Sequence, residues 1–457
     1  MNSPVVFAVA QGALRRRSDP RHVRLTVDLG RVLPSAKFPL VPLGALLDGK
    51  PVYGTNATPT AEPVGYPVLR PNNVTPDGLE MTDLKFWDAP EAEVERLTLR
   101  EGDLLVNRVN ALEHVGKAAV FAGDGVVLHT TNILRLRLNR DLAVPEFVAS
   151  FLNSPAGRLQ SERLGRPITG VAAINTQELS SILIPLPSVP VQTTLLAPLR
   201  AALDGRRDKR TEARRLLLDI GDDFARLVEP SVEAAPALAF ATTIGEMRRI
   251  GRMAPSFFNP ARIQTMTAIL EHGVPVMPLL DVADFVNERA DFEEEADVLG
   301  LAAIEAHTGE FIGATEPAKS GKCYRAEDVL FSRLMPHLNK VAVAPSAGIC
   351  SPEFHVLRVK QSFSTAYLAV ALRSTVVLRQ VSYMAGGGSR PRLVETDARS
   401  ILVPVPDAAV QAEITQMMTA RQSDARRLRL DAEAGWTTAL GDFSDALMPG
   451  IRQDQLD

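Results

Sequence analysis

The chain contains a long internal repeat, and this repeat restricts the possible folds more than any other feature. Residues 101–120 read EGDLLVNRVNALEHVGKAAV, and residues 326–343 read AEDVLFSRLMPHLNKVAV. Further along, SILIPLP at 181–187 matches SILVPVP at 400–406. The matches stay in order while their offset falls from 225 to 219 residues, as a few small loop deletions would produce. A unit this long does not fit a solenoid, so we infer a tandem duplication of one module.

Both copies show the same order of secondary-structure signals. In residues 39–130, short apolar runs alternate with turns containing Gly, Asp and Asn, which is typical of β-strands. PEFVASFLNS, from Pro145, has its large apolar residues at helical spacing and predicts a helix. The loop LGRPITG follows, and SILIPLP then closes the module as a strand ended by prolines. The second copy repeats this order, with strands through residue 360, the helix TAYLAVALRS, the loop AGGGSRP and the strand SILVPVP.

Each copy then ends in a segment that predicts a long helix. Residues 191–228 and 410–447 are rich in Ala and Leu, with apolar residues at intervals of three and four. The first stripe contains Leu195, Leu199, Ala202, Ala213, Leu216, Ile220, Phe224 and Leu227. Arg206 and Lys209 fall on this stripe and interrupt it. A helix of about 35 residues is about 50 Å long, and a narrow apolar stripe requires a partner helix.

The expected fold class is therefore α+β. It consists of two tandem β-rich domains, each followed by a long helix, and the two helices pack as an antiparallel coiled-coil spacer with pseudo-two-fold symmetry. The expected boundaries are 1–190 for the first domain, 191–230 for the first helix, 231–409 for the second domain and 410–450 for the second helix.

Composition excludes several classes of protein. The chain has 457 residues, 46% of them hydrophobic, which suffices for two domains with cores. No apolar run approaches the roughly 20 residues that a membrane-spanning helix needs, and the basic cluster near the N-terminus follows the apolar stretch, opposite to a secretory signal. The two cysteines, Cys323 and Cys350, form no paired motif. We therefore expect a cytoplasmic protein without a disulfide framework, metal or cofactor.

The doubled motifs resemble those of a known family. The first copy contributes YPVLRPNNV, GDLLVNRVNALEHVGKAAV and SILIPLPSVPVQ, and the second contributes EDVLFSRLMPHLNKVAV and SILVPVPDAAVQ. In this order they resemble the specificity (S) subunit of type I restriction–modification systems, over about residues 38–448. The copies also differ, because Glu327 replaces Gly102 and the loop GGGSRP replaces GRPITG.

The resemblance implies a DNA-recognition subunit without catalysis of its own. Each module would be a target-recognition domain that reads half of a split site in double-stranded DNA. The helices would act as a spacer and as docking surfaces for two methyltransferase subunits, and in that family a translocating nuclease subunit can join the complex. Different loops on a shared frame are what two different half-sites require.

The turn-rich segments supply side chains suited to this role. Arg and Lys match guanine edges, Asn and Gln match adenine edges, and Arg, Lys and hydroxyl groups contact phosphates. Glycines in the two loops would let the backbone approach a polyanion closely. The candidate DNA-binding residues are Tyr66, Arg70, Asn72, Asn107, Arg108, Asn110, Lys117, Thr131, Asn132, Arg166, Thr169, Arg333, His337, Lys340, Ser389, Arg390 and Arg392.

Structural roles are open for several of these candidates. Arg108 and Arg333 recur at a fixed spacing from Asp103 and Asp328, so each either forms a structural pair with its aspartate or contacts phosphate. His337 fits the edge of a turn or core, and Asn72 fits a turn. Sequence alone leaves both types of role open at these positions.

Enzymatic alternatives have little support in the sequence. An adenine methyltransferase needs an (Asn/Asp)-Pro-Pro-aromatic motif, and the closest string, Asn259-Pro260-Ala261-Arg262, lacks the second proline and the aromatic residue. No phosphate-binding G-x-x-x-x-G-K-(S/T) loop occurs. Two alternatives remain: a DNA- or RNA-recognition scaffold of another phage-defence complex, or the recognition part of an undetected nuclease. The low aromatic content, 5%, disfavours stacking on single strands.

Overall fold

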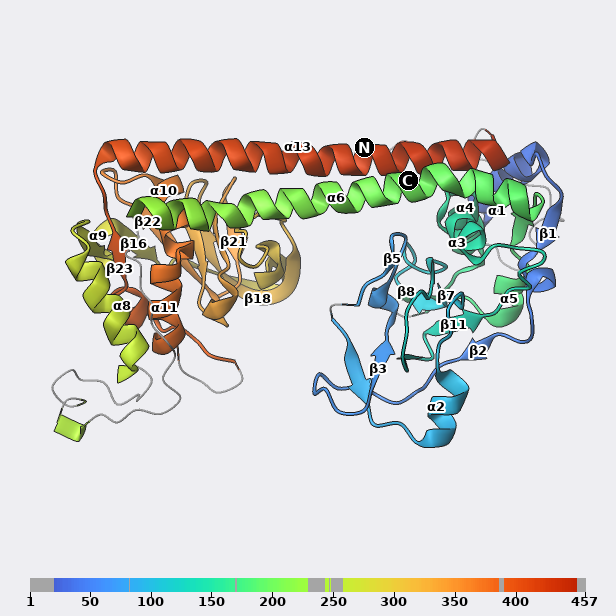
Figure 1. The fold of residues 1–457 in the computed structure, drawn as a ribbon, viewed down its shortest axis with the longest axis horizontal. Coiled ribbons are helices and arrows are strands. Elements are labelled where there is room, and N and C mark those ends of the chain that lie inside the picture. Colours follow the sequence, from blue (N-terminus) through green and yellow to red (C-terminus); the bar gives the residue numbers. More distant parts are fainter. Residues whose placement is uncertain are drawn as a thin grey trace. The chain divides into compact units, whose positions relative to one another are not determined.

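The computed structural model describes residues 20–81, 83–168, 171–228, 243–245, 247, 258–385 and 390–449. The chain divides into two compact units. Unit 1 comprises Met1–Arg207 together with Asp431–Asp457, and unit 2 comprises Asp208–Leu430. Both units contain β-sheets and helices, so the fold is α+β as expected (Figure 1).

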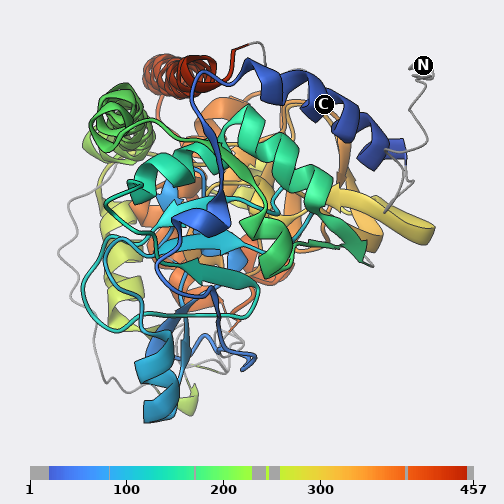
Figure 2. The ribbon, with the colours of Figure 1, turned by 90° about the vertical axis from the view of Figure 1, so that its right-hand side faces the viewer.

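Unit 1 is built from small sheets with helices around them. Its largest sheet has the strand order β2 (Val52–Tyr53), β11 (Ile133–Leu136), β7 (Leu104–Asn107) and β9 (Ala118–Val120). The other sheets are β10 (Leu128–His129)–β3 (Tyr66–Leu69)–β6 (Lys85–Trp87), β12 (Arg166–Ile168)–β13 (Val171–Ala173)–β8 (Val109–Asn110), β1 (Leu40–Pro42)–β14 (Leu183–Pro185) and β4 (Val74–Thr75)–β5 (Gly78–Leu79). The helices are α1 (Pro20–Val32), α2 (Glu91–Leu97), α3 (Pro145–Asn153), α4 (Pro155–Leu164) and α5 (Thr176–Ser180), and Figure 2 shows α1 alongside α4.

Unit 2 repeats much of this arrangement. Its four-stranded sheet has the order β16 (Ala283–Val286), β22 (Phe354–Val359), β19 (Val329–Ser332) and β20 (Val341–Val343). The other sheets are β17 (Arg289–Leu299)–β18 (Thr315–Tyr324)–β21 (Gly348–Cys350) and β15 (Val276–Pro278)–β23 (Leu402–Pro404). The helices are α8 (Pro260–Glu271), α9 (Leu279–Val282), α10 (Thr365–Arg373), α11 (Thr375–Met384) and α12 (Glu395–Ala398).

The same local interactions recur in both copies of the repeat. Ser154 ends α3 and caps α4 by accepting a hydrogen bond from the backbone N–H of Gly157, and Ser374 does the same between α10 and α11. Gln160 exchanges two hydrogen bonds with the backbone of Leu183, at 2.8 and 2.9 Å. Gln380 exchanges the same pair with Leu402, both at 2.9 Å. Equivalent side chains therefore hold the proline-ended strand in each copy.

The two units differ mainly in one segment. In unit 1, the chain between β2 and α2 forms the strands β3 to β6 with short turns. In unit 2, the corresponding segment is the long hairpin of β17 and β18, whose register shifts between Asp291 and Ala296. A shared frame therefore carries two different insertions.

Two helices of 40 residues each, α6 (Val189–Val228) and α13 (Ala408–Leu447), complete the structure. In unit 1, the first part of α6 and the last part of α13 join the core, which contains Leu199 and Phe443. In unit 2, the last part of α6 and the first part of α13 join the other core, which contains Phe224 and Met418. Each helix therefore contributes apolar side chains to the cores of both units.

Each core contains an aromatic contact between a short helix and a 40-residue helix. Phe147 of α3 packs edge-on against Phe443, with ring centroids 5.6 Å apart. Tyr367 of α10 packs against Phe224 at 5.8 Å. In both units, the helix that follows the last strand of the four-stranded sheet thus contacts an aromatic residue of the long helix from the other copy.

The predicted apolar stripe of α6 is wrong at two positions. Leu217 and Val228 are buried, whereas Leu216 is only partly buried and Leu227 is 38% exposed. At each position two apolar residues are adjacent in sequence, and the second of them faces the core. The spacing of apolar residues alone does not indicate which of the two is buried. No helix within the described part of the chain is both long and apolar enough to cross a membrane.

Candidate nucleic-acid interface

Arg108 lies where β7 leaves the four-stranded sheet of unit 1. Its backbone N–H donates to the carbonyl of Asn132 at 2.9 Å, and its carbonyl accepts from the N–H of Ile174 at 2.8 Å. Its guanidinium lies 5.2 Å from the ring centroid of Tyr53, a cation–π distance. The backbone is therefore fixed on both sides while the side chain stays partly exposed.

Arg333 occupies the equivalent position in unit 2. Its N–H donates to the carbonyl of Glu353 at 2.9 Å, and its carbonyl accepts from the N–H of Leu393 at 2.8 Å. The Nε atoms of both Arg108 and Arg333 are shielded from solvent and have no hydrogen-bond partner among the described residues. The two arginines thus have equivalent backbone contacts but different neighbours, because Asn132 in unit 1 is replaced by Glu353 in unit 2.

Neither arginine pairs with the aspartate five residues before it. Asp103 instead accepts a hydrogen bond from Nε of Arg137 at 2.8 Å, and Asp328 accepts one from Nε of Arg358 at 2.9 Å. The structural pairing left open by the sequence is therefore wrong for Arg108. It is equally wrong for Arg333. The guanidinium of Arg108 instead donates to the carbonyl of Thr131 at 3.4 Å.

The turn η4 (Pro71–Asn73) presents further candidates beside β3. Asn72 is exposed, whereas Asn107 is buried beneath the turn and donates to the carbonyl of Pro71 at 3.0 Å. Arg70 pairs with Asp83 at 2.7 Å and thereby lowers the pKa of that carboxyl group. Asn107 thus supports the turn, and Asn72 is its exposed polar side chain.

Tyr66 lies at the start of β3, opposite Trp87 of β6, and is partly exposed. Thr131 and Asn132 lie in the turn before β11, and both are partly exposed. The N–H of Thr131 donates to the carbonyl of Thr55 at 2.8 Å. These contacts bring the turn beside the strand that carries Tyr53.

One small sheet brings Asn110 and Arg166 together. Asn110 pairs with Ala172 of β13, and Arg166 pairs with Ala173 of the same strand. The Asn110 side chain accepts a hydrogen bond from the N–H of Ala111 at 2.8 Å. Arg166 is exposed, although its guanidinium is paired with Glu178.

The two candidate lysines are partly buried and already have partners. Lys117 lies 2.8 Å from Nδ1 of His114, and burial together with the charge of Arg158 lowers its pKa. Lys340 donates to the carbonyl of Leu301 at 2.8 Å, and burial lowers its pKa. Both remain proposals for phosphate contact.

In unit 2, His337 is exposed within the turn η7 (Pro336–Leu338). Arg392 is exposed and pairs with Glu353 at 2.9 Å, which raises the pKa of Arg392. Arg390 is also exposed. Thr169 and Ser389 lie outside the described residues.

Two residues of this interface were not predicted. Tyr53 gave no signal, because a lone aromatic residue in a short strand has no periodicity. Glu353 could have been found, since it corresponds to Asn132 at an offset of 221 residues. Across the described ranges, no group of three or more His, Cys, Asp or Glu residues is placed to hold a metal ion.

Comparison with known proteins identifies relatives but no matching family model. Over 146 residues the chain is 30% identical to the specificity subunit of the type I restriction enzyme EcoKI of Escherichia coli, covering 31% of each protein. Over 141 residues it is 26% identical to the candidate specificity subunit of the type I restriction enzyme MjaX of Methanocaldococcus jannaschii, covering 30% of this chain and 33% of that protein. These curated relatives are specificity subunits of type I restriction enzymes.

The resemblance predicted from the doubled motifs is thereby confirmed. The matched region spans about a third of the length of each relative. Among solved structures, the S subunit of the type I restriction–modification system of M. genitalium matches 91% of this chain and 97% of its own, at 13% identity and a TM-score of 0.40.

Proposed function

We propose that the chain is a non-catalytic specificity subunit in which each β-rich domain reads one half of a split site in double-stranded DNA. The observation that carries this proposal is the pair Arg108 and Arg333. Both emerge from equivalent backbone positions, and both side chains are partly exposed. Arginine is the commonest side chain for reading guanine in the major groove.

Different surroundings give the two arginines different specificities. Asn132 beside Arg108 can pair with adenine, whereas Glu353 beside Arg333 is paired with Arg392 and so holds a second guanidinium group near Arg333. Exposed Asn72 and partly exposed Asn110 add amide groups on the first domain, and Arg390 and Arg392 add basic groups on the second. Two domains with one frame and two sets of readers would recognise two different half-sites.

The long helices would serve as the spacer between the half-sites. In unit 1, Arg206 of α6 pairs with Glu433 of α13. In unit 2, Arg421 of α13 pairs with Asp219 of α6 at 3.4 Å. We infer that α6 and α13 form an antiparallel coiled coil with pseudo-two-fold symmetry, which would hold the domains at a fixed distance and phase on the duplex.

The partners proposed on this basis are two methyltransferase subunits docked on the helices, joined in some complexes by a translocating nuclease subunit. The proposed domain boundaries remain 1–190, 191–230, 231–409 and 410–450. As a recognition subunit, the chain would direct the chemistry of its partners to bases that it does not itself modify.

A selection experiment with the purified chain tests this function. Random-sequence duplexes are bound at about 0.15 M salt against excess competitor, and the bound fraction is sequenced. The proposal predicts two short specified tracts separated by unspecified bases, with affinity that falls steeply as salt rises. A protein scaffold would retain no duplex, and an RNA reader would bind RNA in preference to the same sequence as DNA. A pull-down with the tagged chain tests the partner, because it should recover a large methyltransferase subunit.

A further inference from the structure

Arg206 of α6 connects the long helix to a turn of the first β-rich domain. Its side chain is only 10% exposed, and it pairs with both Asp77 and Glu433. Its guanidinium also lies 5.7 Å from the ring centroid of Trp436. The neighbouring Arg207 donates to the carbonyl of Asp77 at 2.9 Å. Two consecutive arginines of the helix therefore bind Asp77 of the turn, one through its carboxylate and the other through its carbonyl.

The gripped turn leads directly to the candidate base-reading turn. Asp77 lies in the hairpin of β4 and β5, in which the hydroxyl of Thr75 donates to the carbonyl of Gly78 at 2.9 Å. β4 follows Asn73 without a break, so the grip on Asp77 is four residues from the end of the η4 turn that presents Asn72. Any movement of Asp77 away from α6 would be passed to Asn72 along a short, hydrogen-bonded hairpin.

The second β-rich domain is connected to its own long helix in the same manner. Arg429 of α13 pairs with Glu305 at 3.0 Å and also with Glu310. Arg214 of α6 pairs with Glu305 at 3.2 Å. Both glutamates belong to the loop between β17 and β18, in which the N–H of His307 donates to the carbonyl of Leu338 at 3.2 Å. Leu338 follows His337, a candidate DNA contact.

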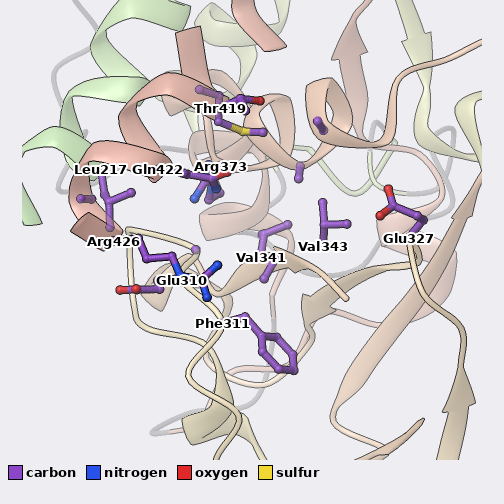
Figure 3. Close-up of a pocket in the computed structure, with 16 residues that line it drawn as sticks. Leu217, Glu310, Phe311, Glu327, Val341, Val343, Arg373, Thr419, Gln422 and Arg426 are labelled. Atoms are coloured by element: carbon purple, nitrogen blue, oxygen red, sulfur yellow. The ribbon is translucent and has the colours of Figure 1, made fainter. Parts of the chain in front are cut away.

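The two gripped loops occupy equivalent places. The turn at 76–78 covers a cavity of about 210 Å³ lined by Ala119, Leu199 and Arg207. The loop at 309–311 covers a cavity of about 370 Å³ lined by the equivalent residues Ala342, Met418 and Arg426. Figure 3 shows Glu310 and Arg426 at one side of the second cavity and Val341 across it.

The charges at these places are arranged differently in the two units. Glu433 and Arg214 are equivalent at an offset of 219, yet one is an acid and the other a base. Glu433 forms an ion pair with Arg206, whereas Arg214 forms an ion pair directly with Glu305 of the loop. The same connection between helix and loop is thus achieved with two different sets of residues, as a functional requirement on both loops would produce.

We propose that Arg206 and Arg429 are positioning residues for DNA recognition, each holding the recognition segment of one domain in its reading position on the long helix. This inference rests on the proposed function and goes beyond it, because neither arginine needs to touch DNA. Each of these two arginines, called clamp arginines below, should affect only the half-site read by its own domain. A purely structural role would instead affect the whole protein or its affinity for every sequence.

The test compares Arg206→Gln and Arg429→Gln in the full-length chain, with Arg215→Gln as the matched control. Among the described residues, the ion-pair partners of Arg215 are Glu212 and Asp219 of its own helix, so its loss removes the same charge without releasing a loop. Selected duplex sequences and affinities for selected and random duplexes are measured for each variant. Hydrogen exchange is followed over residues 71–79 and 301–314.

Arg206→Gln should relax only one specified tract and weaken binding of the selected duplex about tenfold, the value of one lost base contact, with random-duplex affinity unchanged. Arg429→Gln should relax only the other tract. Arg206→Lys should restore part of the loss, and Arg215→Gln should behave as the parent. Parental profiles in both clamp variants, or relaxation of both tracts by each, would overturn the inference.

Two further outcomes are also decisive. If Arg206→Gln does not fold, Asp77→Asn removes the same ion pair from the turn side and should give the same single-tract effect; a parental profile in that variant overturns the inference. If the parent protein selects no sequence, the proposed function fails. The clamp is then judged by hydrogen exchange, which must rise only in the segment of the altered domain.

Discussion

Asp103 and Arg137 form an ion pair, with Nε of the arginine 2.8 Å from Oδ1 of an aspartate that is almost fully buried. Asp328 and Arg358 form the same pair in the second copy. Each aspartate also accepts a hydrogen bond from the backbone N–H three residues earlier. The pair therefore joins the turn before one central strand to the strand beside it, and leaves Arg108 and Arg333 for other contacts.

Replacing Asp103 should destabilise unit 1 severely. Asp103→Ala leaves Arg135, whose side chain is 8% exposed, without its nearest carboxylate, and loss of one partner from a buried pair costs about 3–5 kcal/mol. Both tryptophans of the chain, Trp87 and Trp436, belong to unit 1, so urea denaturation followed by tryptophan fluorescence reports that unit. Glu93→Ala, which removes the exposed pair with Arg96 in the same unit, should change the unfolding free energy by less than about 1 kcal/mol. Equal losses in the two variants would contradict the interpretation.

Gln160 should contribute more stability than an ordinary polar residue. It is 4% exposed and satisfies both backbone groups of Leu183. Gln160→Leu leaves the N–H and C=O of Leu183 without these hydrogen-bond partners and should lower the unfolding free energy of unit 1 by about 1–3 kcal/mol. The exposed Gln177 is the matched control, and Gln177→Leu should stay within about 0.5 kcal/mol of the parent. A neutral Gln160→Leu would show that water replaces the lost bonds.

Local signals predicted much of the fold. The helix starting at Pro145, the strand SILIPLP and both long helices follow from composition and spacing that neighbouring residues supply. The partner of Asp103 could not be predicted in the same way, because Arg137 lies 34 residues away and pairs only once β7 and β11 are side by side. Gln160 was missed for a similar reason, since nothing near it in sequence indicates its backbone partner.

The candidate site was predictable in residue type but not in exposure. Asn107 and Asn72 both have suitable side chains, yet the structure buries the first and exposes the second. Asn72 lies in a turn and Asn107 at the end of a strand beneath that turn, and residue type alone does not indicate which side chain the fold covers. Base reading is therefore proposed for Asn72 and support of the turn for Asn107.

Acidification should weaken unit 1 through His129. This histidine is fully buried, and burial lowers its pKa from 6.5 to about 4. The pKa of His129 is lower in the folded state than in the unfolded state. Its contribution to the free energy of unfolding is therefore constant above pH 6.5 and falls between pH 6.5 and 4, by up to about 3 kcal/mol. His129→Leu should flatten this slope in urea denaturation at each pH, whereas the exposed His114→Gln should leave it unchanged. An identical slope in His129→Leu would refute the assignment.

Lys117→Ala should weaken DNA binding about equally on all duplex sequences, as a phosphate contact would. Removing one phosphate contact lowers the slope of log affinity against log salt concentration by about one. Filter binding to a selected and a random duplex over a salt series measures this slope. Unchanged affinity for both duplexes would assign Lys117 to its internal contact with His114 alone.

The most direct test of the account is sequence selection with Arg108→Ala and Arg333→Ala, the two arginines on the shared backbone frame. Selected duplexes are sequenced for the parent and both variants under the same salt conditions. The account predicts that each variant loses preference at about one base pair, worth about 1–3 kcal/mol, in a different one of two separated tracts. Loss in the same tract for both variants, or an unaltered profile for either, would contradict it.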